Sequence, residues 1–171
     1  MNPLRWSYRV SFLVGFLICA ALIGFALYAQ YELNMDPCPL CILQRVVFIA
    51  MGLIFLIGAL HAPQGGGRWI YSGLASLIAL VGIAISSRHL WIQSLPADQV
   101  PSCGAPLGYL IETRAGNGGL IGVLVKVLSG SGECAKVQPI LGVPMPAWAL
   151  LWFVLLGILA IVAATRRRTL K

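Results

Sequence analysis

Long uncharged stretches alternate with short polar segments along this chain, and four of the uncharged stretches are long enough to cross a lipid bilayer. A helix needs about 20 mostly apolar residues to cross the hydrocarbon core. The candidate spans cover about residues 10–29, 40–60, 70–90 and 147–165. The second contains only one charge, Arg45, and the third is uncharged through residue 87. The pattern predicts an all-α, polytopic membrane protein in which four transmembrane helices form one bundle.

The polar segments between these spans complete the predicted organisation of a single integral membrane domain over residues 1–171. Two of them form external loops, at about residues 30–39 and 91–146. The second loop contains an apolar stretch, residues 120–128, which is too short to span a membrane as a helix. We expect a short helix that lies on the membrane surface there, with a buried strand in a small loop fold as the alternative. The first span lacks a clear signal-peptidase site, which favours an uncleaved anchor.

The composition and the charge distribution support a membrane location. Only 10% of the residues are charged, against about 25% in soluble domains. The net charge of +7 gathers on one side of the predicted topology, and all five acidic residues fall on the other. The basic residues of that side are Arg5, Arg9, Arg68, Arg166, Arg167, Arg168 and Lys171. Because segments rich in Lys and Arg face the cytoplasm, both termini are predicted to be cytoplasmic. The expected partner of these charges is the bilayer and not nucleic acid.

A Cys-x-x-Cys pair, Cys38 and Cys41, stands at the start of the second span. Pro39 suits the first turn of a helix, and a thiolate at that end is favoured by the helix dipole. Arg45 follows Cys41 by four residues, so the two share a helix face, with Arg45 about 6 Å deeper. A cation inside a span is costly and often functional. Redox chemistry is the favoured reading, and a structural disulfide with an outward-reaching Arg45 is the alternative.

Four of the five cysteines fall on the external side: Cys38, Cys41, Cys103 and Cys134. An even number outside the cytosol suggests two disulfides, with Cys103 and Cys134 closing a long loop in turn-rich surroundings that a partner protein could reach. A four-cysteine zinc site usually shows a second Cys-x-x-Cys pair, so no metal site is expected. Cys19, inside the first span, is expected to be an inert apolar residue.

If these two disulfides exchange with each other, they can pass electrons in relay, and the relay needs a final acceptor. Thiol–disulfide exchange moves two electrons at a time, and the chain has no dinucleotide-binding fingerprint and no haem or iron–sulfur ligand set. A lipid-soluble quinone fits, because Arg45 could stabilise the negative charge that develops on its reduction. His89, at the outer end of the third span, should lie at a similar depth. It is either an interfacial polar residue or a hydrogen-bond donor to a polar group near Cys41.

These motifs together resemble the DsbB family, the inner-membrane thiol oxidases of Gram-negative bacteria. The resemblance rests on the four spans, Cys38-x-x-Cys41-x-x-x-Arg45, the two cysteines of the second loop, residues 131–135 and Met145-Pro146-x-Trp148. It implies an enzyme that reoxidises a periplasmic, DsbA-like thioredoxin-fold protein. The electrons would pass to ubiquinone, with menaquinone possible, and so sustain disulfide bond formation.

The resemblance also implies a role for each residue that matches the family. Cys103 would form the mixed disulfide with the DsbA-like partner, and Cys134 would be its mate and exchange with Cys38. Cys41 would be the thiolate that meets the quinone, and Arg45 and His89 would belong to the quinone site. Three rival functions are a thiol oxidase of this kind with a different partner or quinone, a structural membrane protein with bracing disulfides, and a four-helix epoxyquinone reductase of the vitamin K type. The last places its loop cysteines before the membrane Cys-x-x-Cys, an order that this chain does not show.

Overall fold

Four long helices make up nearly all of the protein that the computed structural model describes, which is residues 7–34, 37–63, 66–96, 134, 139–140 and 142–165. They are α1 (Tyr8–Tyr31), α2 (Pro39–His61), α3 (Gly67–Gln93) and α6 (Met145–Thr165). Each is long and apolar enough to cross a membrane, so the predicted four-span bundle is confirmed. A two-residue antiparallel pair, β1 (Pro139–Ile140) and β2 (Val143–Pro144), precedes α6. The predicted surface helix at residues 120–128 and Cys103 lie outside the described residues.

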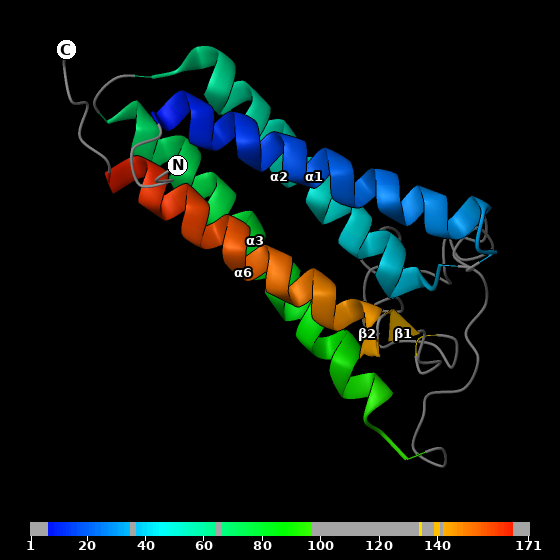
Figure 1. Ribbon diagram of the computed structural model, residues 1–171. Helices are drawn as coiled ribbons and strands as arrows, with labels where there is room; N and C mark the ends of the chain where they lie inside the picture. The colour runs from blue at the N-terminus through cyan, green and yellow to red at the C-terminus, as the bar shows by residue number, and fades with distance from the viewer. Residues whose placement is uncertain are drawn as a thin grey trace, which may run out of the picture.

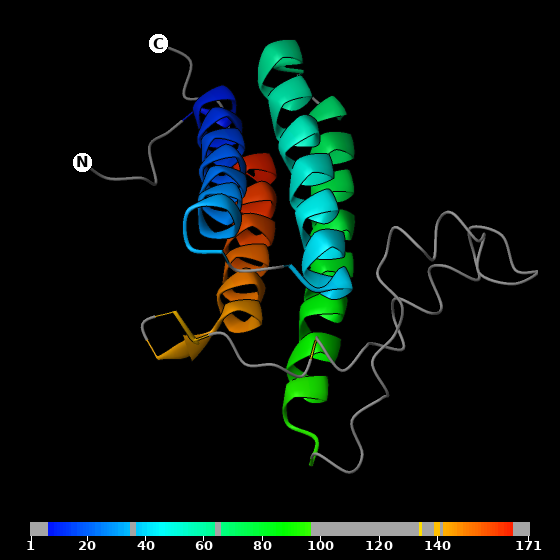
Figure 2. The same cartoon turned by 90° about the vertical axis from the view of Figure 1, so that its right-hand side faces the viewer.

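The helices form a closed ring in which sequence neighbours run antiparallel (Figure 1). Helix α1 packs against α2 and α6, and α3 packs against the same two helices from the other side. Figure 2 shows that α1 begins and α6 ends at one end of the bundle, whereas the β1–β2 pair and the start of α2 lie towards the opposite end. The Cys-x-x-Cys pair is therefore at the end of the bundle opposite the first turn of α1 and the last turn of α6.

Close packing of glycine against phenylalanine joins the helices. A Cβ atom added at Gly58 would lie 2.5 Å from Cδ1 of Phe12, and one at Gly82 would lie 2.5 Å from Cδ1 of Phe153. Small residues at these contacts let helices approach closely, which is how helices associate in a lipid environment. The ring of Phe153 also stacks on Phe48, with centroids 4.0 Å apart and planes 11° apart, and so links α6 to α2.

The outer surface of the bundle is apolar on every helix. Large side chains that are about half exposed include Leu17, Ile57, Leu80 and Ile158. Soluble proteins rarely expose apolar surface on this scale, whereas a bilayer solvates it. The exposed surface thus supports the membrane location that hydropathy predicts.

The helices extend a little beyond the predicted spans. Helix α3 runs from Gly67 to Gln93, beyond the predicted residues 70–90 at both ends. Arg88 lies within both the predicted span and the helix, and its guanidinium is 4.1 Å from the centre of the ring of Trp91, three residues further along α3. Helix α6 begins at Met145, directly after β2, and Gly142 supplies the positive φ of +80° that the preceding turn requires.

Candidate active site

Cys38 and Cys41 form the first turn of α2, with their Sγ atoms 3.0 Å apart. Cys38 is the N-cap residue: its backbone is extended, and its Sγ accepts the backbone N–H of Cys41 at 3.3 Å. Pro39 occupies the first turn, where its missing N–H leaves no bond unmade. A disulfide needs a sulfur separation of about 2.05 Å, so a small side-chain adjustment would close this pair.

Cys38 lies beside two residues from distant parts of the chain. The Nε2 atom of His89, near the end of α3, is 3.7 Å from its Sγ and 3.2 Å from the backbone oxygen of Cys134. The Sγ atoms of Cys38 and Cys134 and Nε2 of His89 all lie within 4.8 Å of one another, and all three residues are buried. The structure thus brings together one cysteine of the Cys-x-x-Cys pair and one cysteine of the long second loop.

The surroundings of Cys38 hold its thiol in the protonated form. The hydrogen bond with the Cys134 side chain lowers the pKa of Cys38, but the hydrogen bond with Cys41 and burial in the bundle raise that pKa to about 12. A thiolate is the attacking species in disulfide exchange. Attack by Cys38 at neutral pH therefore needs a proton acceptor nearby, its release needs a proton donor, and the His89 ring is at hand for both.

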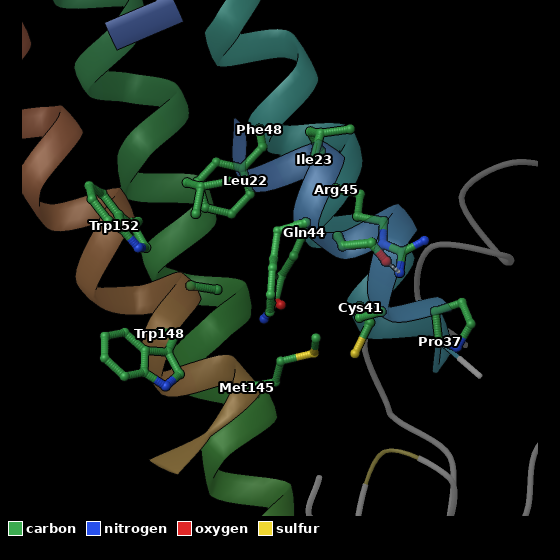
Figure 3. Close-up of a pocket in the computed structure, with 14 residues that line it drawn as sticks. Leu22, Ile23, Pro37, Cys41, Gln44, Arg45, Phe48, Met145, Trp148 and Trp152 are labelled. Atoms are coloured by element: carbon green, nitrogen blue, oxygen red, sulfur yellow. Dashed lines mark hydrogen bonds between the residues drawn. The ribbon is translucent and has the colours of Figure 1, made fainter. Parts of the chain in front are cut away.

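Cys41 faces a different space, a pocket of about 270 Å³ lined by residues of α1, α2 and α6 (Figure 3). In Figure 3, Cys41 and Gln44 on α2 stand opposite Met145 and Trp148 on α6. The apolar part of the lining includes Leu22, Ile23, Phe48, Trp148 and Trp152. Its volume is near the lower end of small-molecule sites, which span about 300–1,000 Å³, and suits a single ring system.

Arg45 lines the same pocket as Cys41, in agreement with the predicted shared helix face. Its guanidinium is tied to α1: Nη2 donates to the backbone oxygen of Ala26 at 3.0 Å, and Nη1 donates to Oε1 of Gln30. These charge-assisted bonds hold the cation at the pocket wall. The alternative of an arginine that merely reaches out to the surface does not describe this side chain.

Gln44 is a pocket residue to which the sequence assigned no role. It is buried, and its Nε2 donates to Oγ of Ser86 on α3 at 3.2 Å. The available signal was a lone amide between Cys41 and Arg45 in an otherwise apolar stretch. Trp148 and Trp152 also line the pocket, although the sequence gave them no chemical role.

His89 does not line the pocket; it contacts Cys38 and Cys134 instead. Its second ring nitrogen, Nδ1, is buried and has no hydrogen-bond partner among the described residues. The expected proximity of His89 to the Cys-x-x-Cys pair therefore holds on the Cys38 side, where its Nε2 lies 3.7 Å from Sγ of Cys38.

Comparison with known proteins agrees with the resemblance seen in the sequence. The family model described as "Disulfide bond formation protein DsbB" matches residues 8–163. A relative named Disulfide bond formation protein B from Xanthomonas campestris pv. campestris is 46% identical over 170 residues, which is 98% of this chain and 96% of the relative. Proteins of the same name from Nitrosococcus oceani and Chromohalobacter salexigens are each 45% identical, over 92% and 94% of this chain and 92% and 95% of theirs. With four helices able to span a membrane, this chain belongs to the DsbB family of bacterial, multi-pass membrane proteins of disulfide bond formation.

Proposed function

We propose that this protein is a thiol oxidase of the bacterial inner membrane, which takes electrons from a DsbA-like, thioredoxin-fold dithiol protein and passes them to a membrane quinone. One observation carries the proposal: the two cysteines of a single helical turn face different surroundings. Cys38 contacts His89 and Cys134, whereas Cys41 lines the pocket. A disulfide between Cys38 and Cys41 would therefore connect a thiol-exchange side with an acceptor side.

On the exchange side, the proposed path consists of four disulfide exchanges. A thiolate of the reduced partner attacks Cys103 of a Cys103–Cys134 disulfide and releases Cys134 as a thiolate. Cys134 then attacks Cys38 of the Cys38–Cys41 disulfide, which releases Cys41 as a thiolate. The second thiolate of the partner displaces Cys103 and leaves the partner oxidised, and Cys103 then attacks Cys134, which restores the Cys103–Cys134 disulfide and releases Cys38. Each exchange breaks one S–S bond and forms another, so the electron pair moves from the partner to Cys38 and Cys41 with no net oxidation. The position of Cys134 beside Cys38 supports the second exchange.

On the acceptor side, the pocket residues fit a flat ring with polar edges. Phe48, Trp148 and Trp152 supply aromatic surface, and Gln44 supplies an amide. A quinone bound there, ubiquinone or menaquinone, would supply a two-electron acceptor that is soluble in the bilayer. The fixed positive charge of Arg45 stabilises negative charge that develops in the pocket. Cys41 gives up its electrons there, and the Cys38–Cys41 disulfide forms again.

The proposal gives His89 a part in the exchange. Its Nε2 atom is 3.7 Å from Sγ of Cys38, and His89 is not among the described residues that line the pocket. A neutral imidazole can take the proton from the Cys38 thiol when the Cys38–Cys41 disulfide forms, and return a proton when Cys38 is released. The sequence-based expectation that His89 serves the quinone is replaced here by a role at the thiols.

The proposed orientation places both ends of the chain in the cytoplasm and the cysteines in the periplasm. Two basic residues that the structure describes, Arg9 and Arg68, belong to the first turns of α1 and α3. Those turns are at the opposite end of the bundle from Cys38 and Cys41 (Figure 2). Basic residues mark the cytoplasmic side of short loops and helix ends, which supports this orientation.

An anaerobic turnover assay tests the proposed function. The purified protein in detergent is mixed with a reduced thioredoxin-fold dithiol protein and a soluble ubiquinone or menaquinone analogue, and quinone absorbance is followed. The wild type and the control Cys19→Ser should reduce the quinone catalytically, whereas Cys41→Ser and Cys103→Ser should not. Lack of turnover by the wild type, with the outer cysteines still paired under a mild thiol, would instead favour a structural protein with bracing disulfides.

A further inference from the structure

Three potential metal ligands converge at the start of α2 from segments far apart in the chain. They are Sγ of Cys38, Sγ of Cys134 and Nε2 of His89, all within 4.8 Å of one another. In a tetrahedral zinc site the Zn–S and Zn–N distances are about 2.3 and 2.0 Å, which separates neighbouring ligand atoms by about 3.5–3.8 Å. The separation of 3.7 Å between Cys38 and His89 already matches this geometry. A movement of about 1 Å would bring the third atom into place.

Cys41 offers a fourth ligand atom once its side chain turns from the pocket towards Cys134 and His89. Its Sγ is 3.0 Å from that of Cys38 but is not among the atoms that all lie within 4.8 Å of one another, so this rotation is needed to complete a set of three thiolates and one imidazole. Such a set is one of the common four-coordinate zinc environments. The sequence predicted no metal site because it shows only one Cys-x-x-Cys pair. The structure adds His89 from α3 and Cys134 from the second loop, and these two residues supply the ligands that a second cysteine pair would otherwise supply.

The surroundings favour a borderline-soft cation and exclude hard ones. The ligands are thiols and an imidazole, with no carboxylate among the described residues of the cluster, a set that suits Zn²⁺ and not Mg²⁺ or Ca²⁺. Leu40, between Cys38 and Cys41 in the sequence, and Ile92, three residues after His89 on α3, are fully buried and apolar. Little water competes for the ion in such a place.

One feature distinguishes this cluster from a permanent structural zinc site. A zinc-binding histidine almost always donates its other ring N–H to an acceptor, which fixes the ring and strengthens the bond. Nδ1 of His89 is buried without a partner among the described residues. Nε2 must also leave the backbone oxygen of Cys134, which lies 3.2 Å away, before it can bind a metal. Binding should consequently be reversible.

We propose that the reduced protein binds one Zn²⁺ ion through Cys38, Cys41, Cys134 and His89, and that the bound ion blocks disulfide formation at these cysteines. The thiols release their protons when they bind the ion. A sulfur that shares a disulfide no longer offers a thiolate, so the ion and the disulfide exclude each other. Metal binding requires only the reduced thiols and does not depend on the quinone step. Inhibition of turnover in the membrane rests, in addition, on the proposed function.

A binding assay without quinone tests the site directly. The protein is reduced anaerobically in detergent, the reductant is removed, and Zn²⁺ is titrated against a chromophoric zinc indicator. Co²⁺ serves as a second probe, because thiolate ligation gives charge-transfer absorption. One ion should bind per chain. Cys134→Ser and His89→Gln should each weaken binding about tenfold or more, whereas His61→Gln, at the other end of α2, should leave it unchanged. Wild-type affinity in both ligand variants would overturn the proposal.

A second measurement on the wild type guards against variants that fold poorly. Diamide oxidises a dithiol to a disulfide by taking two electrons and two protons, and it needs no quinone. Saturating Zn²⁺ should slow the diamide oxidation of Cys38 about tenfold or more, and a chelator should restore the original rate. Unchanged oxidation at saturating Zn²⁺ would refute the blocking role. Failure of quinone turnover in a protein that still binds Zn²⁺ would count against the proposed function alone.

Discussion

The contact between Gly82 and Phe153 leads to a quantitative prediction about packing in this bundle. In Gly82→Ala the added Cβ would lie 2.5, 2.6 and 2.7 Å from three ring atoms of Phe153, whereas carbon atoms prefer separations of about 3.5–4.0 Å. The ring would have to move by about 1 Å. It is fully buried and stacked on Phe48, which lines the pocket, so the displacement would reach the pocket wall.

A control on the same helix isolates the size of this effect. Gly73 is exposed and has no atom within 4 Å of its added Cβ, so Gly73→Ala brings only the gain in helix propensity, about 0.8–1.0 kcal/mol. Gly82→Ala brings the same gain and, in addition, an overpacking cost of about 1–3 kcal/mol. Because the propensity contribution cancels between the two variants, their stabilities should differ by the overpacking cost alone. For a chain of this size that difference corresponds to about 2–12 °C in unfolding temperature.

Thermal unfolding in detergent micelles, followed by circular dichroism, measures this difference. Gly82→Ala should unfold at the lower temperature, and the double variant Gly82→Ala/Phe153→Leu should recover part of the loss, because the shorter side chain makes room for the new methyl group. Binding of a soluble quinone analogue should weaken in Gly82→Ala and stay unchanged in Gly73→Ala. Equal unfolding temperatures for the two glycine variants would refute the packing argument.

Three further predictions concern the candidate site. Arg45→Met should slow quinone reduction about 10²–10³-fold and leave partner exchange at Cys103 unchanged, because the charge that is lost lies at the pocket. Gln30→Leu keeps that charge and should slow quinone reduction far less. Equal loss of both steps in Arg45→Met would contradict this division. In stopped-flow measurements, His89→Gln should slow both the release of Cys38 from Cys134 and the formation of the Cys38–Cys41 disulfide in prereduced protein, because the imidazole serves the Cys38 proton in both steps. Binding of a soluble quinone analogue should stay unchanged. Weakened binding with normal thiol steps would return His89 to the acceptor side. Since the pKa of Cys38 is raised to about 12, its thiolate fraction grows about tenfold per pH unit between pH 7 and 10. The rate of Cys38 alkylation by iodoacetamide, measured by peptide mass spectrometry, should therefore rise over this range without a plateau. A plateau near pH 9 would show an ordinary thiol.

The spans were predictable because hydropathy alone determines them. Each is an apolar run of bilayer length. Because lipid surrounds the bundle, the outer faces of the helices are apolar too, and no polar stripe interrupts the run. The ends of α3 were less predictable, because hydropathy places the middle of a span better than its ends: the helix begins at Gly67 and runs to Gln93, past the predicted limits of residues 70 and 90. Arg88 lies inside both the predicted span and the helix, with its guanidinium over the ring of Trp91.

The local part of the site followed from helix spacing, and the distant part did not. Cys41 and Arg45 are one turn apart on α2, so their common wall of the pocket was predictable. The meeting of Cys38 with Cys134 and His89 depends on how α2 and α3 are rotated against each other and on the return of the second loop. Spacing contains no information on either, and only the family resemblance suggested that Cys134 would reach Cys38.

The sulfur cap of α2 has a consequence for the order of the helix itself. The Sγ atom that accepts the N–H of Cys41 belongs to the residue that would change partners in every catalytic cycle. When that sulfur turns towards Cys134, the first turn loses the acceptor that satisfies one of its unpaired amides. The amide hydrogen of Cys41 should then exchange with solvent faster, and the end of α2 should loosen and tighten with each passage of electrons. The oxidation state of the cysteines could therefore be followed through the hydrogen exchange of the Cys41 backbone amide, a group that takes no part in electron transfer.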